Sequence, residues 1–216
     1  MNRIVCLLSV LGLVSLTGCA TRYNHFVRLV HDEQSELGVA TDQGILFTGR
    51  NLQEGEVEIW STFQSEQFFQ VPGSVARFEE NLGLIETPAN FLPLTISDRN
   101  PLPDDDVQIA GLGADGDVWY LTAYVPEDSA NRGSILSCDD LWEMKPEDIA
   151  GAAVLVWRDE SWQLAGLVWA RLEISGRRYA AYADVREISR VYRGNADYLE
   201  PPAPVKMRGI NTIPDY

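Results

Sequence analysis

Residues Asp148 to Trp169 read DIAGAAVLVWRDESWQLAGLVW, and this stretch decides the fold class. Two apolar runs, Ala152–Trp157 and Gln163–Arg171, lie on either side of Asp159-Glu160. Short apolar runs that are separated by turn residues are typical of neighbouring β-strands. The stretch therefore predicts two strands joined by a turn at Asp159-Glu160.

The same pattern continues along the chain in both directions from this pair. Turn signals occur at Thr41-Asp42-Gln43-Gly44, Pro72-Gly73, Asp115-Gly116 and Ser175-Gly176. The other short apolar or alternating runs are His25–Val30, Gly38–Ala40, Ile45–Thr48, Val57–Thr62, Phe68–Val71, Leu82–Glu86, Val107–Gly111, Val118–Val125 and Arg178–Tyr182. Many short strands at this spacing predict an all-β barrel or sandwich.

Only two stretches have a helical pattern. Asp139–Met144 is long enough for about one turn. In Asp184–Arg193, apolar residues recur at helical spacing, Asp184 can cap the start, and Gly194 can end the helix. The sequence therefore predicts one short helix near the C-terminus.

Charge excludes two classes of function. The 216 residues include 17 Lys and Arg against 32 Asp and Glu, which gives a net charge of −15. Non-specific binding to nucleic acid requires clustered basic side chains, and so does electrostatic adsorption to anionic lipid. We therefore expect no nucleic-acid partner, and a preference for basic or neutral partners.

The N-terminus has the features of a secretory signal. One basic residue in Met1-Asn2-Arg3 precedes a short apolar stretch, Ile4–Leu16, which is too short for an ordinary membrane span. The sequence Leu16-Thr17-Gly18-Cys19 that ends it resembles the bacterial lipobox. That resemblance implies removal of residues 1–18 and acylation of Cys19, whereas the alternative is an ordinary cleaved signal followed by a chance cysteine.

The lipobox resemblance also implies a location and a domain plan. Because Ala20 follows the cysteine, it implies an outer-membrane anchor in a bacterial cell envelope, with the lipid bilayer as partner. We expect a lipidated tether at residues 19–25, a β-domain with its terminal helix at residues 26–194, and a proline-bearing tail at residues 195–216. Cys138 would be the only remaining thiol, and a small buried hydrophobe is its expected role.

Several segments resemble the bacterial trypsin-like serine proteases in order and spacing. Gly44–Gly55 is similar to the segment that carries their catalytic His, and Glu80–Ile85 to the strand that carries the Asp. Asp148–Leu155 resembles the nucleophile loop, and Leu164–Trp169 resembles the apolar strand that follows it after a turn. Leu92–Leu94 with Val107–Gly113, and Tyr179–Arg186, resemble a middle connection with its strand and the closing strand with its helix. The resemblance implies a trypsin-like double β-barrel with a short C-terminal helix.

The catalytic positions of that family are occupied here by other residues. The resemblance places Asn51 at the His position, Asn81 at the Asp position and Ala150 at the Ser position. Asp148 stands where the family has the glycine of the oxyanion hole. Triad chemistry needs a hydroxyl, an imidazole and a carboxylate, and the only histidines, His25 and His31, precede the barrel. The sequence therefore predicts a pseudoprotease that is not an enzyme.

The family cleft suggests how such a chain could still function. An extended peptide can add as a strand beside the cleft through backbone hydrogen bonds. The resemblance implies that the cleft includes the degenerate positions together with Gly151, Leu167, Val168, Trp169 and Ala170. The predicted function is a binding or scaffolding module for a peptide or an envelope protein.

Other chemistry is less well supported by the residues. We expect no metal and no cofactor: His31-Asp32-Glu33 supplies one imidazole on a strand, and Asp104-Asp105-Asp106 and Asp115-Gly116-Asp117 lack the spacing of a calcium loop. Two alternatives remain open: an envelope hydrolase that uses acid/base chemistry without a triad, and a purely structural lipoprotein.

Overall fold

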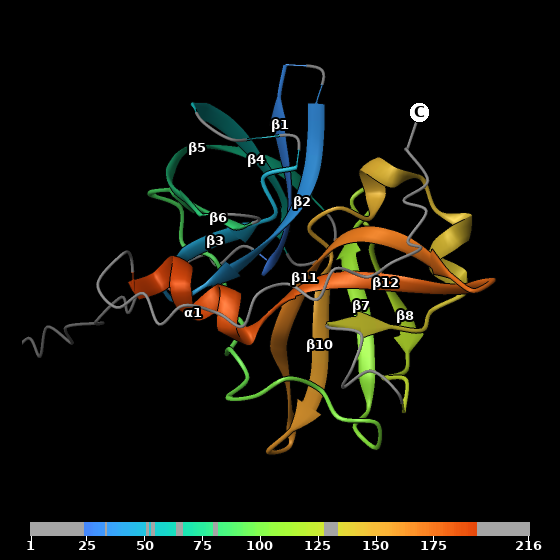
Figure 1. Ribbon diagram of the computed structural model, residues 1–216. Coiled ribbons are helices and arrows are strands. Elements are labelled where there is room, and N and C mark those ends of the chain that lie inside the picture. The colour runs from blue at the N-terminus through green and yellow to red at the C-terminus, as the bar shows by residue number, and fades with distance from the viewer. Residues whose placement is uncertain are drawn as a thin grey trace, which may run out of the picture.

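The computed structural model describes residues 24–32, 34–50, 52, 55–63, 67–79, 82–127 and 134–193. These residues form two antiparallel β-units side by side, followed by one helix (Figure 1). The predicted all-β fold class, a double β-barrel with a short C-terminal helix, is confirmed. The signal sequence, Cys19 and the tail at residues 195–216 lie outside the described residues.

The first unit, barrel 1, is a closed six-stranded barrel in the order β1-β2-β3-β6-β5-β4. It closes because β1 pairs with β2 on one side and with β4 on the other. Its strands are β1 Phe26–His31, β2 Gln34–Thr41, β3 Gly44–Phe47, β4 Glu56–Phe63, β5 Gln67–Glu79 and β6 Leu82–Glu86.

The second unit, barrel 2, is a six-stranded sheet in the order β8-β7-β10-β11-β12-β9. Among the described residues, its two outer strands are joined only by an isolated antiparallel bridge between Tyr124 and Ser137. Its strands are β7 Val107–Leu112, β8 Val118–Ala123, β9 Ile135–Leu136, β10 Ala153–Arg158, β11 Ser161–Ile174 and β12 Arg177–Asp184.

The apolar core of the described residues has a main part inside each barrel, a third part between them and a smaller cluster on barrel 2. Leu29, Ile45 and Ile59 belong to the interior of barrel 1, whereas Ile109 and Val154 belong to barrel 2. The third cluster joins strands of both barrels to the helix and includes Phe26, Val39, Leu46, Leu112, Leu155, Leu164, Ile188 and Val191. This shared cluster holds the two barrels together.

The helix α1, Val185–Arg193, begins with a capping box. The Asp184 carboxylate accepts hydrogen bonds from the backbone N–H groups of Arg186 (2.9 Å) and Glu187 (3.3 Å). In return, the Glu187 carboxylate accepts one from the N–H of Asp184 (2.8 Å). The predicted cap at Asp184 is therefore confirmed. No described helix is long and apolar enough to span a membrane.

Most of the predicted turns form, and one does not. Asp159-Glu160 and Ser175-Gly176 connect strands with all four φ angles positive, as a tight hairpin turn requires. Pro72-Gly73 instead lies inside β5, where the ladder to β6 has not yet begun. Gly73 is needed there because a Cβ would lie 2.5 Å from the Ile59 side chain in the barrel interior.

Candidate functional site

The loop that leads into β10 contains the position that the resemblance assigns to the nucleophile. It begins with the short 3-10 helices η2, Asp140–Glu143, and η3, Pro146–Asp148, and it continues through the buried Ala150 to Gly151. The N–H of Asp148 donates to the carbonyl of Lys145 (3.0 Å), and the N–H of Ala150 donates to that of Pro146 (3.2 Å). Both backbone donors therefore make hydrogen bonds within the loop.

Gly151 fixes this loop against barrel 1. Its φ of +84° is in the left-handed region, and a Cβ at this position would lie 1.8 Å from the carbonyl oxygen of Leu37 in β2. The neighbouring Ala150 carbonyl accepts a hydrogen bond from the N–H of Leu37 (2.8 Å). Only glycine permits this backbone-to-backbone approach between the barrels.

A buried ion pair joins the same loop to β1. The Nη2 atom of Arg28 lies 2.6 Å from the Asp148 carboxylate and also donates to the carbonyl of Leu112 (3.0 Å). The Arg28 side chain is 7% exposed and that of Asp148 is 25% exposed. The Asp148 carboxylate is therefore paired with a residue that the sequence reasoning missed. Its only signal in the sequence was a charged side chain inside an apolar run.

The other two positions that the resemblance assigns to the triad, Asn51 and Asn81, lie outside the described residues. The residue before Asn51 is described, and it crosses between the barrels. The Nη1 atom of Arg50 donates a hydrogen bond to the backbone carbonyl of Trp169 in β11, at 3.1 Å. Sequence reasoning missed Arg50 as well, because nothing in a single sequence shows which residue faces across a cleft.

The candidate binding edge is the part of β11 that begins at Trp169. The ladder to β10 ends at Leu167. The N–H of Val168 then donates to the carbonyl of Ala152, and the carbonyl of Val168 accepts from the N–H of Gly151, both at 2.8 Å. After Val168, no described strand pairs with β11 on this side. This edge therefore has the geometry of a strand that can accept a further strand.

Two of the residues expected in the cleft, Trp169 and Ala170, have accessible side chains at this edge. Leu167 and Val168 are fully buried in the core, and Gly151 is packed against β2. Trp169 is 36% exposed and lies at an irregularity in the pairing of β11 with β12, and Ala170 is half-buried. The accessible surface therefore begins at Trp169.

A cationic cluster continues along the same strand. Arg171 donates from Nη1 to the carbonyl of Met144 (3.1 Å), and its guanidinium lies over the Trp142 ring at 5.3 Å. Arg178 of β12 lies over the same ring at 5.2 Å. Two guanidinium groups therefore share one tryptophan next to the candidate binding edge.

The acidic runs have structural partners. A carboxylate oxygen of Asp105 accepts from the N–H of Leu102 (2.9 Å) and forms an ion pair with Arg158. Asp115 accepts from the N–H of Asp117 (3.1 Å), as expected in a turn. Within the part of the chain that the structure describes, no group of three or more His, Cys, Asp or Glu side chains comes together as a metal site would require.

The two remaining candidate residues, His31 and Cys138, also have structural roles. His31 does not precede the barrel as expected but is the last residue of β1 in barrel 1, and its Nδ1 lies 2.7 Å from the carbonyl of Glu56. Cys138 is 3% exposed within the core of barrel 2, and burial raises the pKa of its thiol. The expectation that Cys138 is a small buried hydrophobe is confirmed.

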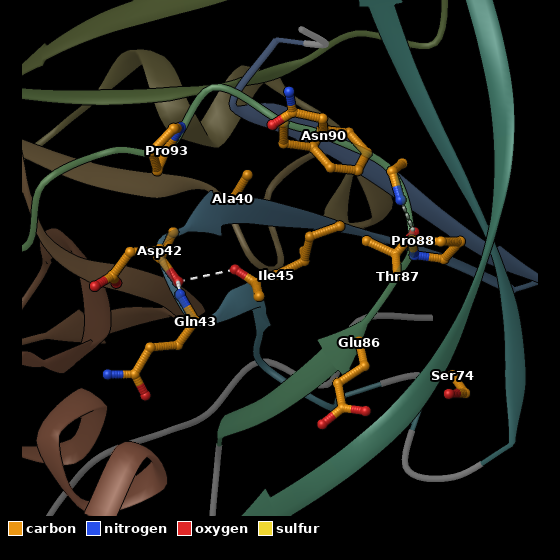
Figure 2. Close-up of a pocket in the computed structure, with 14 residues that line it drawn as sticks. Ala40, Asp42, Gln43, Ile45, Ser74, Glu86, Thr87, Pro88, Asn90 and Pro93 are labelled. Carbon is orange, nitrogen blue, oxygen red and sulfur yellow. Dashed lines mark hydrogen bonds between the residues drawn. The ribbon is translucent and has the colours of Figure 1, made fainter. Parts of the chain in front are cut away.

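A pocket of about 770 Å³ lies on barrel 1, away from the binding edge. Figure 2 shows Asp42, Gln43 and Glu86 around it, beside the turn that joins β2 to β3. It lies at the beginning of β3, whereas Arg50 follows the end of that strand. The pocket is therefore separate from the contact between the barrels.

Comparison with solved structures identifies the architecture. The chain is similar to the Rv3671c protease of M. tuberculosis H37Rv in an inactive form, at 11% identity and a TM-score of 0.55, covering 76% of this chain and 85% of that one. It is similar to a serine endoprotease from Yersinia pestis at 16% identity and a TM-score of 0.58, covering 78% and 61% respectively. It is similar to kallikrein-related peptidase 10 at 16% identity and a TM-score of 0.54, covering 79% of this chain and 96% of that one.

The fold is that of the trypsin-like serine proteases. No protein-family model matches the sequence, and no curated protein does. The structural likeness therefore establishes the fold of this chain, at sequence identities well below those at which activity can be transferred.

The sequence-based prediction that the chain is not an enzyme is wrong, because the fold comparison contradicts it. The solved structures that share the fold are serine proteases, which are enzymes. Two of the three triad-equivalent positions lie outside the described residues, and nothing in the described residues shows the chain to be inactive.

Proposed function

We propose that this chain is a lipid-anchored protein of the bacterial cell envelope whose trypsin-like domain binds an extended polypeptide segment. The segment, from a peptide or from another envelope protein, adds as a strand to the edge of β11 at Trp169. The observation that carries the proposal is this edge, which has no described strand partner beyond Val168 and has Trp169 at its surface.

The chemistry of the edge supports peptide binding. A strand edge offers backbone N–H and C=O groups in a fixed order, and an added peptide satisfies them without any need for a particular sequence. The indole of Trp169 adds a large, rigid contact surface at little cost in conformational entropy. Neither contribution depends on the side chains at positions 51, 81 and 150.

The anchor is supported by Leu16-Thr17-Gly18-Cys19 at the end of the apolar N-terminal stretch. Several acyl chains on Cys19 would hold the domain at a membrane without basic side chains. In cell fractionation, the wild-type chain should be found with the membranes, and Cys19→Ser should be soluble or unprocessed. A fractionation pattern that Cys19→Ser leaves unchanged would contradict the anchor.

The binding site is tested with a matched pair of tryptophans. We would select random dodecapeptides against the full chain in detergent and measure the affinity of the selected peptides for Trp169→Ala and Trp157→Ala. Trp157 is 44% exposed and pairs with Trp162 next to the end of the β10–β11 ladder on barrel 2, so it controls for loss of an exposed indole. Loss of binding in Trp169→Ala alone supports the proposal, and equal binding to both variants contradicts it.

A further inference from the structure

An acidic pocket lies on barrel 1, at the turn between β2 and β3. It is the pocket of about 770 Å³ in Figure 2, and its lining includes Asp42 and Glu86 but, among the described residues, no Lys or Arg. Within the part of the chain that the structure describes, neither carboxylate has a hydrogen bond or an ion pair. The buried side chains of Ile45 and Phe91 line the same pocket. The pocket therefore combines two carboxylates with apolar surface, which suits a cation on an aliphatic chain.

The backbone that carries the two carboxylates is fixed in place. Thr41, which lines the pocket, donates from Oγ1 to the carbonyl of Gly44 at 2.8 Å. Gly44 has a φ of +135°, and a Cβ there would lie 2.6 Å from the carbonyl oxygen of Ile85 in β6. Glu86 is the next residue and ends β6. Binding of a cation here therefore requires little further ordering of barrel 1.

The helix α1 ends beside this pocket. The hydroxyl of Tyr192 donates to Thr41 Oγ1 at 2.6 Å. Burial is the main cause that raises the pKa of Tyr192 to about 12, and the negative charge of Asp42 also raises it, so this carboxylate lies near the helix. Arg193, the next residue, is the last one of α1. The chain therefore leaves the helix close to Asp42.

The sequence that follows the helix carries the complementary charge. Residues 194–216 lie outside the described residues, and within them the stretch 201–214, PPAPVKMRGINTIP, has two basic residues, Lys206 and Arg208, and no acidic one. Lys206 comes thirteen residues after Arg193, and a chain of this length reaches up to about 40 Å. The apolar stem of a lysine can pack on apolar surface while its ammonium meets a carboxylate. The stretch therefore has the reach and the charge that the pocket requires.

Attachment to the same chain favours this stretch over a separate molecule. An exposed pair of a lysine and a carboxylate is weak in water, and a separate molecule that relied on it would also lose its translational freedom on binding. A segment attached nearby binds instead at an effective concentration of about millimolar. Pro201, Pro202 and Pro204 also reduce the conformational freedom that docking removes. Two exposed carboxylates can therefore hold a segment of their own chain.

We infer that residues 201–214 occupy the acidic pocket, with the ammonium of Lys206 at the carboxylates of Asp42 and Glu86. The contact is intramolecular and lies on barrel 1 away from the β11 edge, so it does not depend on the proposed peptide binding. It gives the pocket an occupant from the chain itself and closes it to other cations.

Zero-length cross-linking with a carbodiimide tests this contact, because the reagent joins an amine to a carboxylate only where the two groups touch. The chain has just two lysines, Lys145 and Lys206, so each product can be assigned by digestion and mass spectrometry. In the full chain at low concentration in detergent, the main product of Lys206 should be an intramolecular link to Asp42 or Glu86. Raising the salt to about 0.5 M should reduce this product several-fold, because salt screens exposed charges.

The variant with Asp42→Asn and Glu86→Gln should lose this product. Its control is Asp104→Asn with Glu160→Gln, which makes the same change in net charge at exposed positions outside the pocket and should keep the product.

Three results would overturn the inference. The first is a set of Lys206 links spread over carboxylates outside the pocket. The second is a link that forms only between two molecules, as shown by mixing isotope-labelled with unlabelled chain. The third is a Lys206 that forms no link at all. None of these results bears on peptide binding at the β11 edge, which the tryptophan variants test.

Discussion

The two barrels differ in how their strands are closed. Barrel 1 is closed by a ladder of three residue pairs between β1 and β4. Barrel 2 is closed by one bridge, in which Tyr124 and Ser137 exchange two hydrogen bonds of 3.0 and 2.8 Å. Barrel 1 therefore leaves few free backbone groups, whereas barrel 2 keeps strand edges available.

This difference separates two tasks in the molecule. Barrel 1 supplies the groups that reach across the interface, namely Arg28, Leu37 and Arg50. Barrel 2 supplies the loop and the strand edge that receive them. A closed barrel can position such groups rigidly, and the more open sheet can accept an additional strand.

The contact between backbones at Gly151 is the most sensitive part of this arrangement. Gly151→Ala should destabilise the fold by about 4 kcal/mol or more, because it combines left-handed strain with overlap against the backbone of β2. Gly176→Ala is the matched control: its φ is +74°, but nothing lies within 4 Å of the added Cβ. We expect about 1 kcal/mol there from strain alone, measured by urea unfolding with circular dichroism.

Similar costs for the two glycine variants would show that the barrels can separate at Gly151 without loss of stability. In that case, the two barrels would behave as independent units. A large difference would show that the interface is part of the cooperative core.

The ion pair of Arg28 and Asp148 is the next strongest link between the barrels. Arg28→Met leaves a carboxylate without its partner, and we expect a loss of about 3 kcal/mol, at the low end for buried pairs because Asp148 is partly exposed. The double variant Arg28→Met with Asp148→Leu removes both charges and should recover most of the loss. Urea unfolding of both variants tests this, and a double variant as unstable as Arg28→Met would contradict it.

Arg28 also shows where sequence reasoning reaches its limit. The all-β fold, the helix cap at Asp184 and the turn at Asp159-Glu160 were predictable, because they depend on local patterns of apolar, capping and turn residues. The partner of Asp148 lies 120 residues away along the chain. A single sequence contains no signal for such a pair.

The candidate site was only partly predictable for the same reason. The resemblance located the loop at Ala150 and the strand at Trp169. Burial then removed Leu167 and Val168 from the accessible surface, because β11 has core on both faces here: Val168 packs inside barrel 2 and Leu167 packs in the cluster between the barrels. Pro72-Gly73 was misjudged as a turn because the need for a glycine against Ile59 arises only when the barrel closes.

Lowering the pH should weaken the interface between the two barrels by protonating His25, which directly precedes β1 of barrel 1. Burial lowers the pKa of His25 from 6.5 to about 4, and its ring packs edge-on against Phe26, which contacts Tyr120 of β8. Because the unfolded chain binds this proton more tightly, stability from His25 is complete above pH 6.5 and is lost as the pH falls toward 4. We expect a loss of about 2 kcal/mol between pH 7 and pH 4.5.

Urea unfolding at the two pH values measures this loss. His25→Phe should reduce the difference between the two values, although carboxylates still contribute to what remains. The same substitution at His31, whose side chain is 43% exposed, removes the chain's only other imidazole and should keep the wild-type difference. Equal pH dependence in both variants would show that His25 is not responsible.

The smallest expected effect concerns the helix, which follows barrel 2 in sequence but bonds to barrel 1. The Tyr192 hydroxyl donates to Thr41 Oγ1 at 2.6 Å, and Thr41 donates in turn to the carbonyl of Gly44 in the β2–β3 turn. Tyr192→Phe should cost about 1 kcal/mol, whereas Tyr124→Phe, at a residue that is 67% exposed, should cost almost nothing in urea unfolding. If the two costs are equal, apolar packing of Ile188 and Val191 alone fixes α1 across the two barrels. If they differ as expected, the helix joins the barrels through a specific polar contact as well.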